Sequence, residues 1–246
     1  MKLCLFALTG FGNSVLEKAV ESDCIDEVMV FTRRERGKFP YYESEDLLGF
    51  CKREGITVFT EDEISDKERL TIIKEYSPDL MIVATYHKKI PAELLALPKY
   101  KAVNIHPSLL PAYRGATPTN WALINGESKT GITFHLVSEE YDMGAVLYQK
   151  EVPISDLDDG KLRKYLAKVA GEELDKFIDD YTSIKLNPKQ QSRSDGSYFP
   201  KVTSEEGIKL LNSGLFEPDN IRKGLTPFPG VESLRKELKW DTKVMS

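Results

Sequence analysis

Three polar side chains stand in segments that the chain could bring together. Asn104 and His106 flank Ile105 in a short apolar run, and Asp142 lies 36 residues beyond His106 (142 − 106) between two strand-like segments. Because side chains alternate along a strand, Asn104 and His106 project from the same face. A loop between two strands can return the carboxylate of Asp142 to the imidazole. We therefore predict one catalytic site built from these three residues.

These residue types suit acyl transfer between two nitrogens. A neutral imidazole, with an unperturbed pKa of about 6.5, can accept the proton that an attacking amine must lose. A neighbouring carboxylate orients that imidazole, and an Asn amide can donate to a developing oxyanion. No Ser or Cys nucleophile is required if the amine attacks directly. Each residue also has an ordinary structural interpretation: a core histidine for His106, and turn residues for Asn104 and Asp142.

The residues before this site predict an α/β sheet. Short apolar runs alternate with amphipathic stretches, which is the pattern of strands and crossover helices. We predict a mostly parallel, doubly wound, Rossmann-like sheet, whose ligands belong at the carboxyl ends of the strands. The expected strands are 2–8, 28–32, 57–59, 79–85 and 102–106, and the expected helices are 14–22, 43–54, 67–76 and 91–97.

The pattern changes after residue 106. A helix at 119–125 precedes two strand-like runs, 131–137 and 145–154, with the spacing of a hairpin-like pair, and residues 158–184 have near-helical apolar spacing. Turn signals then become frequent, including the Pro-Phe-Pro-Gly segment at 227–230. We predict a catalytic domain over 1–184 and a small C-terminal appendage of irregular or β structure over 185–246, too small to hold a core alone.

The composition excludes several classes of protein. With 41% hydrophobic residues the chain is too apolar for disorder, and 34 basic against 39 acidic residues leave a net charge of −5 without the basic footprint of a nucleic-acid binder. Apolar runs are too short for a membrane span, and the short apolar start does not resemble a signal peptide. The three cysteines, Cys4, Cys24 and Cys51, form no CxxC pair. We predict a cytoplasmic protein with reduced thiols and no metal site.

A glycine-rich segment, Gly10-Phe11-Gly12-Asn13-Ser14-Val15, follows the first strand and has two interpretations. It resembles a dinucleotide fingerprint with Val15 in place of the third glycine. That fingerprint needs an acid about 20 residues on, whereas the second strand ends in Arg33-Arg34, which would suit only the 2′-phosphate of NADP. The alternative is a turn whose amides face any ligand at the sheet edge. An NADP-dependent oxidoreductase therefore remains one possible function.

Four motifs, in order, resemble the signature of the folate-dependent formyltransferase family. They are Asn104-x-His106-x-Ser108-Leu109-Leu110-Pro111, Arg114-Gly115, Thr130-Gly131-x-Thr133 and Asp142-x-Gly144. The resemblance covers at least residues 1–154, and Asn104, His106 and Asp142 match the family's catalytic trio. It implies a Rossmann-like enzyme domain in which 10-formyltetrahydrofolate donates its formyl group to an amine.

Two motifs of the C-terminal region resemble the sugar N-formyltransferases of this family. They are Tyr198-x-Pro200-Lys201 and the Pro-Phe-Pro-Gly segment after Arg222. The tRNA enzymes have a related element but carry a further β-barrel domain, for which 246 residues leave no room, and the acidic balance disfavours tRNA. We predict formylation of a dTDP- or UDP-linked amino sugar in O-antigen or surface polysaccharide biosynthesis. The alternatives are glycinamide ribonucleotide formyltransferase and a non-catalytic folate- or sugar-nucleotide-binding protein.

The resemblance also implies binding residues and an assembly. The pterin is expected beside two loops, through Thr85, Tyr86, His87, Ile90, Glu140 and Tyr141. The nucleotide sugar is expected over the glycine-rich turn and the basic loop 33–42, through Phe11, Gly12, Asn13, Arg34, Tyr41, Tyr42 and Arg114. The loop's cations suit a diphosphate and its aromatics a base, although a solvated surface loop has the same composition. A homodimer through the C-terminal region is expected, with Phe216, Leu225 and Phe228 exposed or capping the first domain's core.

Overall fold

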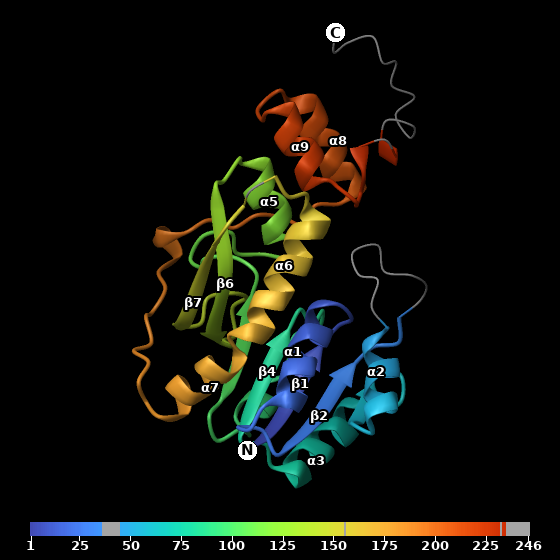
Figure 1. Ribbon diagram of the computed structural model, residues 1–246, viewed down its shortest axis with the longest axis vertical. Helices are drawn as coiled ribbons and strands as arrows, with labels where there is room; N and C mark the ends of the chain where they lie inside the picture. Colours follow the sequence, from blue (N-terminus) through green and yellow to red (C-terminus); the bar gives the residue numbers. More distant parts are fainter. Residues whose placement is uncertain (36–44, 155, 232, 235–246) are drawn as a thin grey trace.

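The computed structural model describes residues 1–35, 45–154, 156–231 and 233–234. Within them the chain forms a seven-stranded sheet in the order β3-β2-β1-β4-β5-β6-β7 (Figure 1). The first five strands are parallel, while β6 runs antiparallel to β5 and β7 to β6. The predicted Rossmann-like, mostly parallel sheet is confirmed. The strands are β1 (Lys2–Ala7), β2 (Glu27–Thr32), β3 (Thr57–Thr60), β4 (Leu80–Ala84), β5 (Ala102–His106), β6 (Lys129–Leu136) and β7 (Val146–Pro153).

Alternating side chains of the central strands face two helical layers. Leu3 and Leu5 of β1 belong to a core with α1 (Phe11–Glu21), α2 (Leu47–Glu54), α6 (Asp159–Glu172) and α7 (Leu174–Thr182). Cys4 and Phe6, one residue out of phase, pack with α3 (Asp66–Tyr76) and α4 (Ala92–Leu95) on the other face. The period of two therefore assigns each strand residue to one layer. Both faces are covered, as a parallel sheet requires.

Capping residues set several helix boundaries. The hydroxyl of Ser65 accepts a hydrogen bond from the backbone N–H of Glu68, and α3 begins at Asp66, directly after Ser65. Asp46 caps α2 in the same way, so that helix starts later than its predicted first residue, 43. Asp158 caps α6. These short polar signals therefore define the ends of elements whose apolar pattern alone leaves the boundary open.

The C-terminal region is helical, so the prediction of irregular or β structure there is wrong. It contains α8 (Ser204–Ser213) and α9 (Pro218–Gly224). Trp121 and Ile124 of α5 (Pro118–Ile124) complete its apolar cluster, whose other buried members are Val202, Leu210, Ile221, Leu225 and Leu234. Leu225 is fully buried there against α5, which agrees with the alternative of capping rather than exposure, whereas Phe228 is 46% exposed. The region thus shares its core with α5, and the division at residue 185 remains a prediction.

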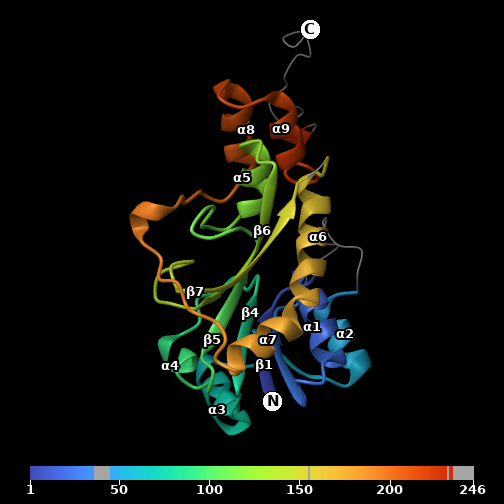
Figure 2. The same ribbon diagram turned by 60° about the vertical axis from the view of Figure 1, so that its left-hand side comes forward.

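Residues 185–200 form a largely irregular segment, here called the strap, that links α7 to α8 and contains the 3-10 helix η1 (Arg193–Asp195). In Figures 1 and 2 it runs along the β7 side of the sheet toward α8. The backbones of Val146 and Lys189 exchange two hydrogen bonds of 2.8 Å, and Tyr198 pairs with Arg114. The strap therefore contacts both the last strand and the loop after β5.

Within the described residues, no helix has the length and apolar character needed to cross a membrane. The three cysteines are free thiols, and Cys4 and Cys51 are buried. Burial raises the pKa of Cys51 to about 12, so its thiol stays protonated near neutral pH.

Candidate active site

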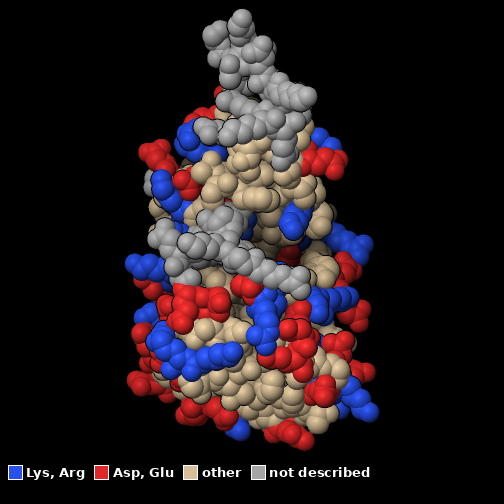
Figure 3. Space-filling model, turned by 90° about the vertical axis from the view of Figure 1, so that its right-hand side faces the viewer, with Lys and Arg blue, Asp and Glu red and all other residues tan. Residues whose placement is uncertain are grey.

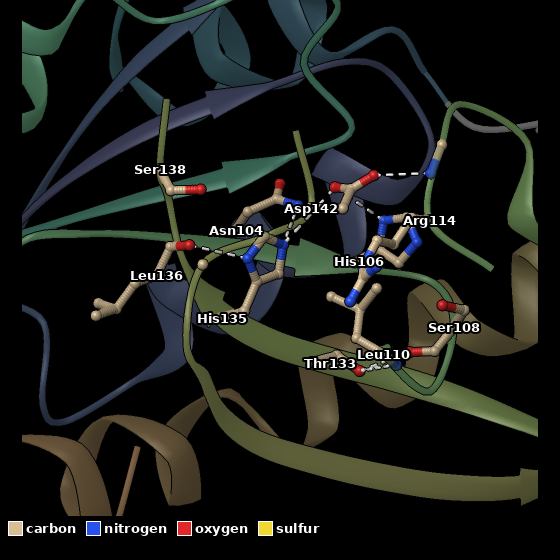
Figure 4. Close-up of polar contacts among 12 residues, drawn as sticks. Asn104, His106, Ser108, Leu110, Arg114, Thr133, His135, Leu136, Ser138 and Asp142 are labelled. Atoms are coloured by element: carbon tan, nitrogen blue, oxygen red, sulfur yellow. Dashed lines mark hydrogen bonds and ion pairs between the residues drawn. The ribbon is translucent and has the colours of Figure 1, made fainter. Parts of the chain in front are cut away.

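The β5 strand delivers Asn104 and His106 to the carboxyl edge of the sheet. Both side chains project from one face, as predicted, and their neighbours on antiparallel β6 are His135 and Thr133 respectively. His106 is 4% exposed, whereas Asn104 is partly exposed. Figure 4 shows that the side chains of Asn104, His106 and His135 converge with that of Asp142. The structure thus brings together the three residues that the sequence singled out.

Asp142 is held by the loops around it. Its Oδ1 lies 3.4 Å from Nδ1 of His106, and its Oδ2 accepts a 2.9 Å hydrogen bond from the backbone N–H of Gly115. Its φ of 56° lies in the left-handed region, which Asp tolerates better than most residues. A Cβ on Gly144 would stand 1.7 Å from the carbonyl oxygen of Leu136, so only glycine allows this return of the chain.

The hydrogen bonds of His106 define where its protons lie. Nε2 is 2.9 Å from the carbonyl oxygen of Tyr113, which can only accept, so Nε2 carries a hydrogen and donates it. The other nitrogen, Nδ1, faces the carboxylate of Asp142. The atom of the imidazole that can exchange a proton at the site is therefore Nδ1, beside Asp142. An imidazole nitrogen and a carboxylate oxygen thus lie together at the edge of the sheet.

His135, which lies within the predicted strand 131–137, is a further member of the cluster. Its Nδ1 donates to the carbonyl oxygen of Leu136 at 2.9 Å, and its Nε2 accepts from Nδ2 of Asn104 at 3.0 Å. Burial and the neighbouring His106 lower the pKa of His135 to about 4, so the ring is neutral at physiological pH. A neutral ring with its hydrogen on Nδ1 can accept from Asn104, and it thereby fixes which end of that amide carries the donors.

The spacing of the polar residues on β5 and β6 could have indicated that His135 belongs to the site. Asn104 and His106 are polar residues two apart on β5, and Thr133 and His135 have the same spacing on β6. Polar side chains at this period on two adjoining strands share one face. Thr133 fixes the loop after β5, because its hydroxyl donates to the carbonyl of Ser108 and accepts from the N–H of Leu110.

The loops expected to hold the pterin lie at the same edge. Thr85 and His87 are exposed after β4, and Glu140 and Tyr141 are exposed before Asp142. Ile90 is buried in the cluster that Val137, at the end of β6, also contacts, so the two loops share an apolar base. Exposed loop residues above an apolar base are compatible with the polar edge and flat faces of a pterin.

Tyr86 takes a different direction from the other residues of its loop. Its ring packs edge-on against Phe6 at 5.2 Å, within the core of the α3 face. Burial and the neighbouring Glu61 carboxylate raise the pKa of Tyr86. Its side chain therefore packs into the core beneath the loop, and contact of Tyr86 with the pterin stays a prediction.

The glycine-rich turn also turns its side chains inward. Phe11 and Asn13 are buried, with Oδ1 of Asn13 accepting from the N–H of Gly10 and Nδ2 donating to the carbonyl of Glu45. A Cβ on Gly12 would stand 2.6 Å from that of Ala7. The amides of Asn13 and its neighbours serve the turn itself, so a ligand here would meet backbone groups, and substrate contact by these residues stays a prediction.

The two arginines expected at the nucleotide sugar have protein partners in the structure. Arg34 pairs with the carboxylates of Asp62 and Glu63 at the surface. Arg114 is buried, and its guanidinium donates to the side chain of Gln191 and the carbonyl of Ser192, both in the strap. The remaining two residues of that prediction, Tyr41 and Tyr42, lie outside the described residues.

The fold and the site together define an α/β transferase-type centre, with an amide, an imidazole and a carboxylate at the carboxyl edge of a Rossmann-like sheet. The Formyl transferase family model matches residues 14–178, which include all three. The chain therefore belongs to the folate-dependent formyltransferase family and is a formyl-transferring enzyme. Its formyl donor is 10-formyltetrahydrofolate, as the family implies. Binding of the pterin by the loops after β4 and β6 stays a prediction.

Three comparisons show the extent of this relationship. The methionyl-tRNA formyltransferase of Caldanaerobacter subterraneus subsp. tengcongensis is 35% identical over 94% of this chain and 75% of its own length. The structure of WlaRD, a sugar 3N-formyl transferase in the presence of dTDP and 5-N-formyl-THF, is 19% identical with a TM-score of 0.64, covering 91% of this chain and 78% of its own. Glycinamide ribonucleotide transformylase 1 of Geobacillus kaustophilus is 28% identical with a TM-score of 0.59, covering 72% and 96% respectively.

Proposed function

We propose that this enzyme transfers the formyl group of 10-formyltetrahydrofolate to the amine of a dTDP- or UDP-linked amino sugar. The observation that carries the proposal is the C-terminal architecture: the strap and α8–α9 are built onto the catalytic loops through Arg114 and α5. The fold likeness to a sugar 3N-formyl transferase extends over 91% of this chain, against 72% for the glycinamide ribonucleotide enzyme. This difference favours the sugar enzymes over the purine-pathway enzyme.

We propose Asn104, His106 and Asp142 as the catalytic residues. When bound, 10-formyltetrahydrofolate supplies an electrophilic formyl carbon. Nδ2 of Asn104 has two hydrogens, of which one is donated to His135, leaving the other for the formyl oxygen. The His106–Asp142 pair takes the proton that the amine loses as its nitrogen bonds to the formyl carbon. The same pair returns that proton to the donor nitrogen as the old bond breaks.

The charge distribution supports a small acceptor. The net charge is −5, and Figure 3 shows basic and acidic side chains interspersed on the face it displays. Affinity for a nucleic acid comes largely from neutralising phosphates with a basic surface. Arg34 is already paired with two exposed carboxylates, and such surface pairs contribute little, so one diphosphate can replace them. A nucleotide sugar needs no larger basic field.

Methionyl-tRNA is the second candidate acceptor, favoured by the 35% identity to the Caldanaerobacter enzyme. The two candidates predict different products from one assay. The protein would be mixed with 10-formyltetrahydrofolate and a panel of dTDP- and UDP-4-amino sugars, then separately with charged initiator tRNA, with Asp142→Asn as the blank. We expect a sugar product heavier by one formyl group. Formylation of the tRNA alone would overturn the proposal.

We also propose that the enzyme works in the cytoplasm as a homodimer formed through its C-terminal region. Three free thiols suit a reducing compartment. Leu215 and Phe228 are 80% and 46% exposed in the segments that follow α8 and α9, where a second copy could cover them. Light scattering on the full chain would report the mass. Replacing both residues with Ser should give monomers, whereas a monomeric wild-type protein would contradict the dimer.

A further inference from the structure

The strap places a glutamine directly behind Asp142. Nε2 of Gln191 donates to the backbone carbonyl of Asp142 at 2.9 Å and to that of Gly144 at 2.6 Å. These two carbonyls flank Met143, at the point where the chain turns through the left-handed conformation of Asp142. One amide therefore holds both ends of the turn that presents the carboxylate.

Arg114 fixes the orientation of this amide. Its Nε and Nη2 donate to Oε1 of Gln191 at 3.3 and 3.1 Å, and a guanidinium can only donate. The oxygen of the amide must therefore face Arg114, and the NH2 must face the Asp142 loop. Because Arg114 is buried and charged, it polarises the amide and strengthens the two bonds on the other side.

The strap is also joined to the other support of Asp142. The backbone N–H of Arg114 donates to the carbonyl of Ser197, and the N–H of Phe199 donates to the carbonyl of Arg114. Gly115, the next residue, donates its own N–H to Oδ2 of Asp142. A Cβ on Gly115 would stand 2.3 Å from the carbonyl oxygen of Phe199, so strap and loop lie in close contact. The carboxylate and its backbone are thus both held, directly or through one residue, by residues 191–199.

We propose that Gln191 is a positioning residue for Asp142, so that the C-terminal strap completes the active site. The inference rests on the proposed catalytic role of Asp142. The two N–H donors of Gln191, rather than the volume of its side chain or its bond to Arg114, set the position of the Asp142 carboxylate beside His106. Misplacing a catalytic group by about 1 Å can cost on the order of 100-fold in rate.

Two variants separate these contributions. Gln191→Glu keeps an oxygen acceptor for Arg114 but turns an oxygen toward the carbonyls of Asp142 and Gly144. Gln191→Met keeps the length and loses both sets of bonds. The matched control is Gln190→Glu at the exposed neighbouring residue. We expect kcat to fall about 10- to 100-fold in both Gln191 variants, with KM for the acceptor within about threefold of wild type, and no fall in the control.

The assay is run well below the midpoint of thermal unfolding, so that a loss of stability cannot imitate the effect. A second readout needs no acceptor: the chain has three histidines, and the ring signals of His106 in NMR spectra of histidine-labelled protein report the nearby carboxylate. We expect the Gln191 variants to shift the signals of His106 and leave those of His87 in place.

Asp142→Asn distinguishes the failure of this inference from failure of the proposed catalytic role. If Asp142→Asn is inactive while both Gln191 variants keep wild-type kcat and His106 signals, the positioning role is wrong. A fall in kcat in Gln191→Met without a fall in Gln191→Glu would also overturn the positioning role, because the bond to Arg114, and not the two N–H donors, would then account for the effect. If Asp142→Asn retains full activity, the catalytic assignment fails first and the inference falls with it.

Discussion

The two halves of the sheet are stabilised in different ways. In one half, formed by β3, β2, β1 and β4 and called here the apolar half, the strand β4 is Leu-Met-Ile-Val-Ala and is buried along its whole length. The other half, formed by β5, β6 and β7, is called here the polar half. Its strands β5 and β6 bury His106, Thr133 and His135, and each of these side chains forms a hydrogen bond with the backbone of a loop or of a neighbouring residue. Apolar burial is non-directional, whereas buried polar groups are stable only with their partners in place. The first half is therefore a scaffold that tolerates exchange of similar residues, and the second holds one geometry.

The largest expected effect comes from removing the carboxylate in the polar half. We expect Asp142→Asn to lower kcat by about 10²- to 10⁴-fold, because the proton of the amine loses its acceptor beside His106. The amide oxygen of the introduced Asn can still accept the hydrogen bond from the backbone N–H of Gly115, so folding should be preserved. Steady-state kinetics and a thermal melt measure the two properties. A variant with kcat within a few fold of wild type would remove Asp142 from the chemistry.

The buried neutral His135 predicts a pH dependence of stability. Its pKa is about 4 in the fold, below the unfolded value near 6.5, so the unfolded chain binds more protons between these pH values. The contribution of the neutral His135 to the free energy of unfolding is fully present above pH 6.5 and is lost as the pH falls through 4. At 1.36 kcal/mol per pKa unit this amounts to about 3 kcal/mol. Urea unfolding from pH 4 to 7 gives the free energy of unfolding of wild type and of His135→Gln at each pH. We expect this free energy to rise less steeply with pH in the variant, and an equal dependence on pH would refute the neutral ring.

The apolar half should respond to a small cavity in stability alone. Ile82 in β4 is fully buried, and Ile82→Val removes one methylene without touching a hydrogen bond. We expect the free energy of unfolding to fall by about 1 kcal/mol, with kcat unchanged below the thermal transition. The same assays used for Asp142→Asn apply. A tenfold loss of kcat would show that the two halves are coupled more closely than their interactions indicate.

The smallest expected effect on stability is at the surface beside the basic loop. Arg34 pairs with Asp62 and Glu63, and both carboxylates are exposed. Arg34→Gln should change the free energy of unfolding by less than about 1 kcal/mol. If Arg34 exchanges these partners for a diphosphate, KM for the nucleotide sugar rises while kcat is kept. An unchanged KM would place the diphosphate elsewhere.

The sequence predicted the strands in both halves of the sheet. Short apolar runs located the seven strands to within one or two residues, because burial of a strand leaves a pattern that is visible locally. The C-terminal helices were missed, since their buried residues Leu210 and Ile221 pack in one cluster with Trp121 of α5, 89 and 100 residues earlier (210 − 121 and 221 − 121), and the turn signals nearby suggested irregular structure.

The proposed catalytic residues, Asn104, His106 and Asp142, could be recognised by residue type and spacing, but the residues that support them could not. His135 looks like an ordinary strand residue until β6 is paired with β5 in register. The role of Gln191 depends on a contact between segments 49 residues apart, and its own neighbours carry no pattern that marks it. Chemistry-bearing residues can therefore be proposed from a sequence, whereas the groups that hold them require the fold.

One measurement tests the proposed reaction most directly. Equal concentrations of a dTDP- or UDP-linked 4-amino sugar, glycinamide ribonucleotide and charged initiator tRNA would compete for limiting isotopically labelled 10-formyltetrahydrofolate, with the enzyme at catalytic concentration. Mass spectrometry would then locate the label. We predict that the labelled formyl group appears on the amino sugar in wild type and on no acceptor with Asp142→Asn. Label on the tRNA or on glycinamide ribonucleotide, with the sugars unmodified, would contradict the account.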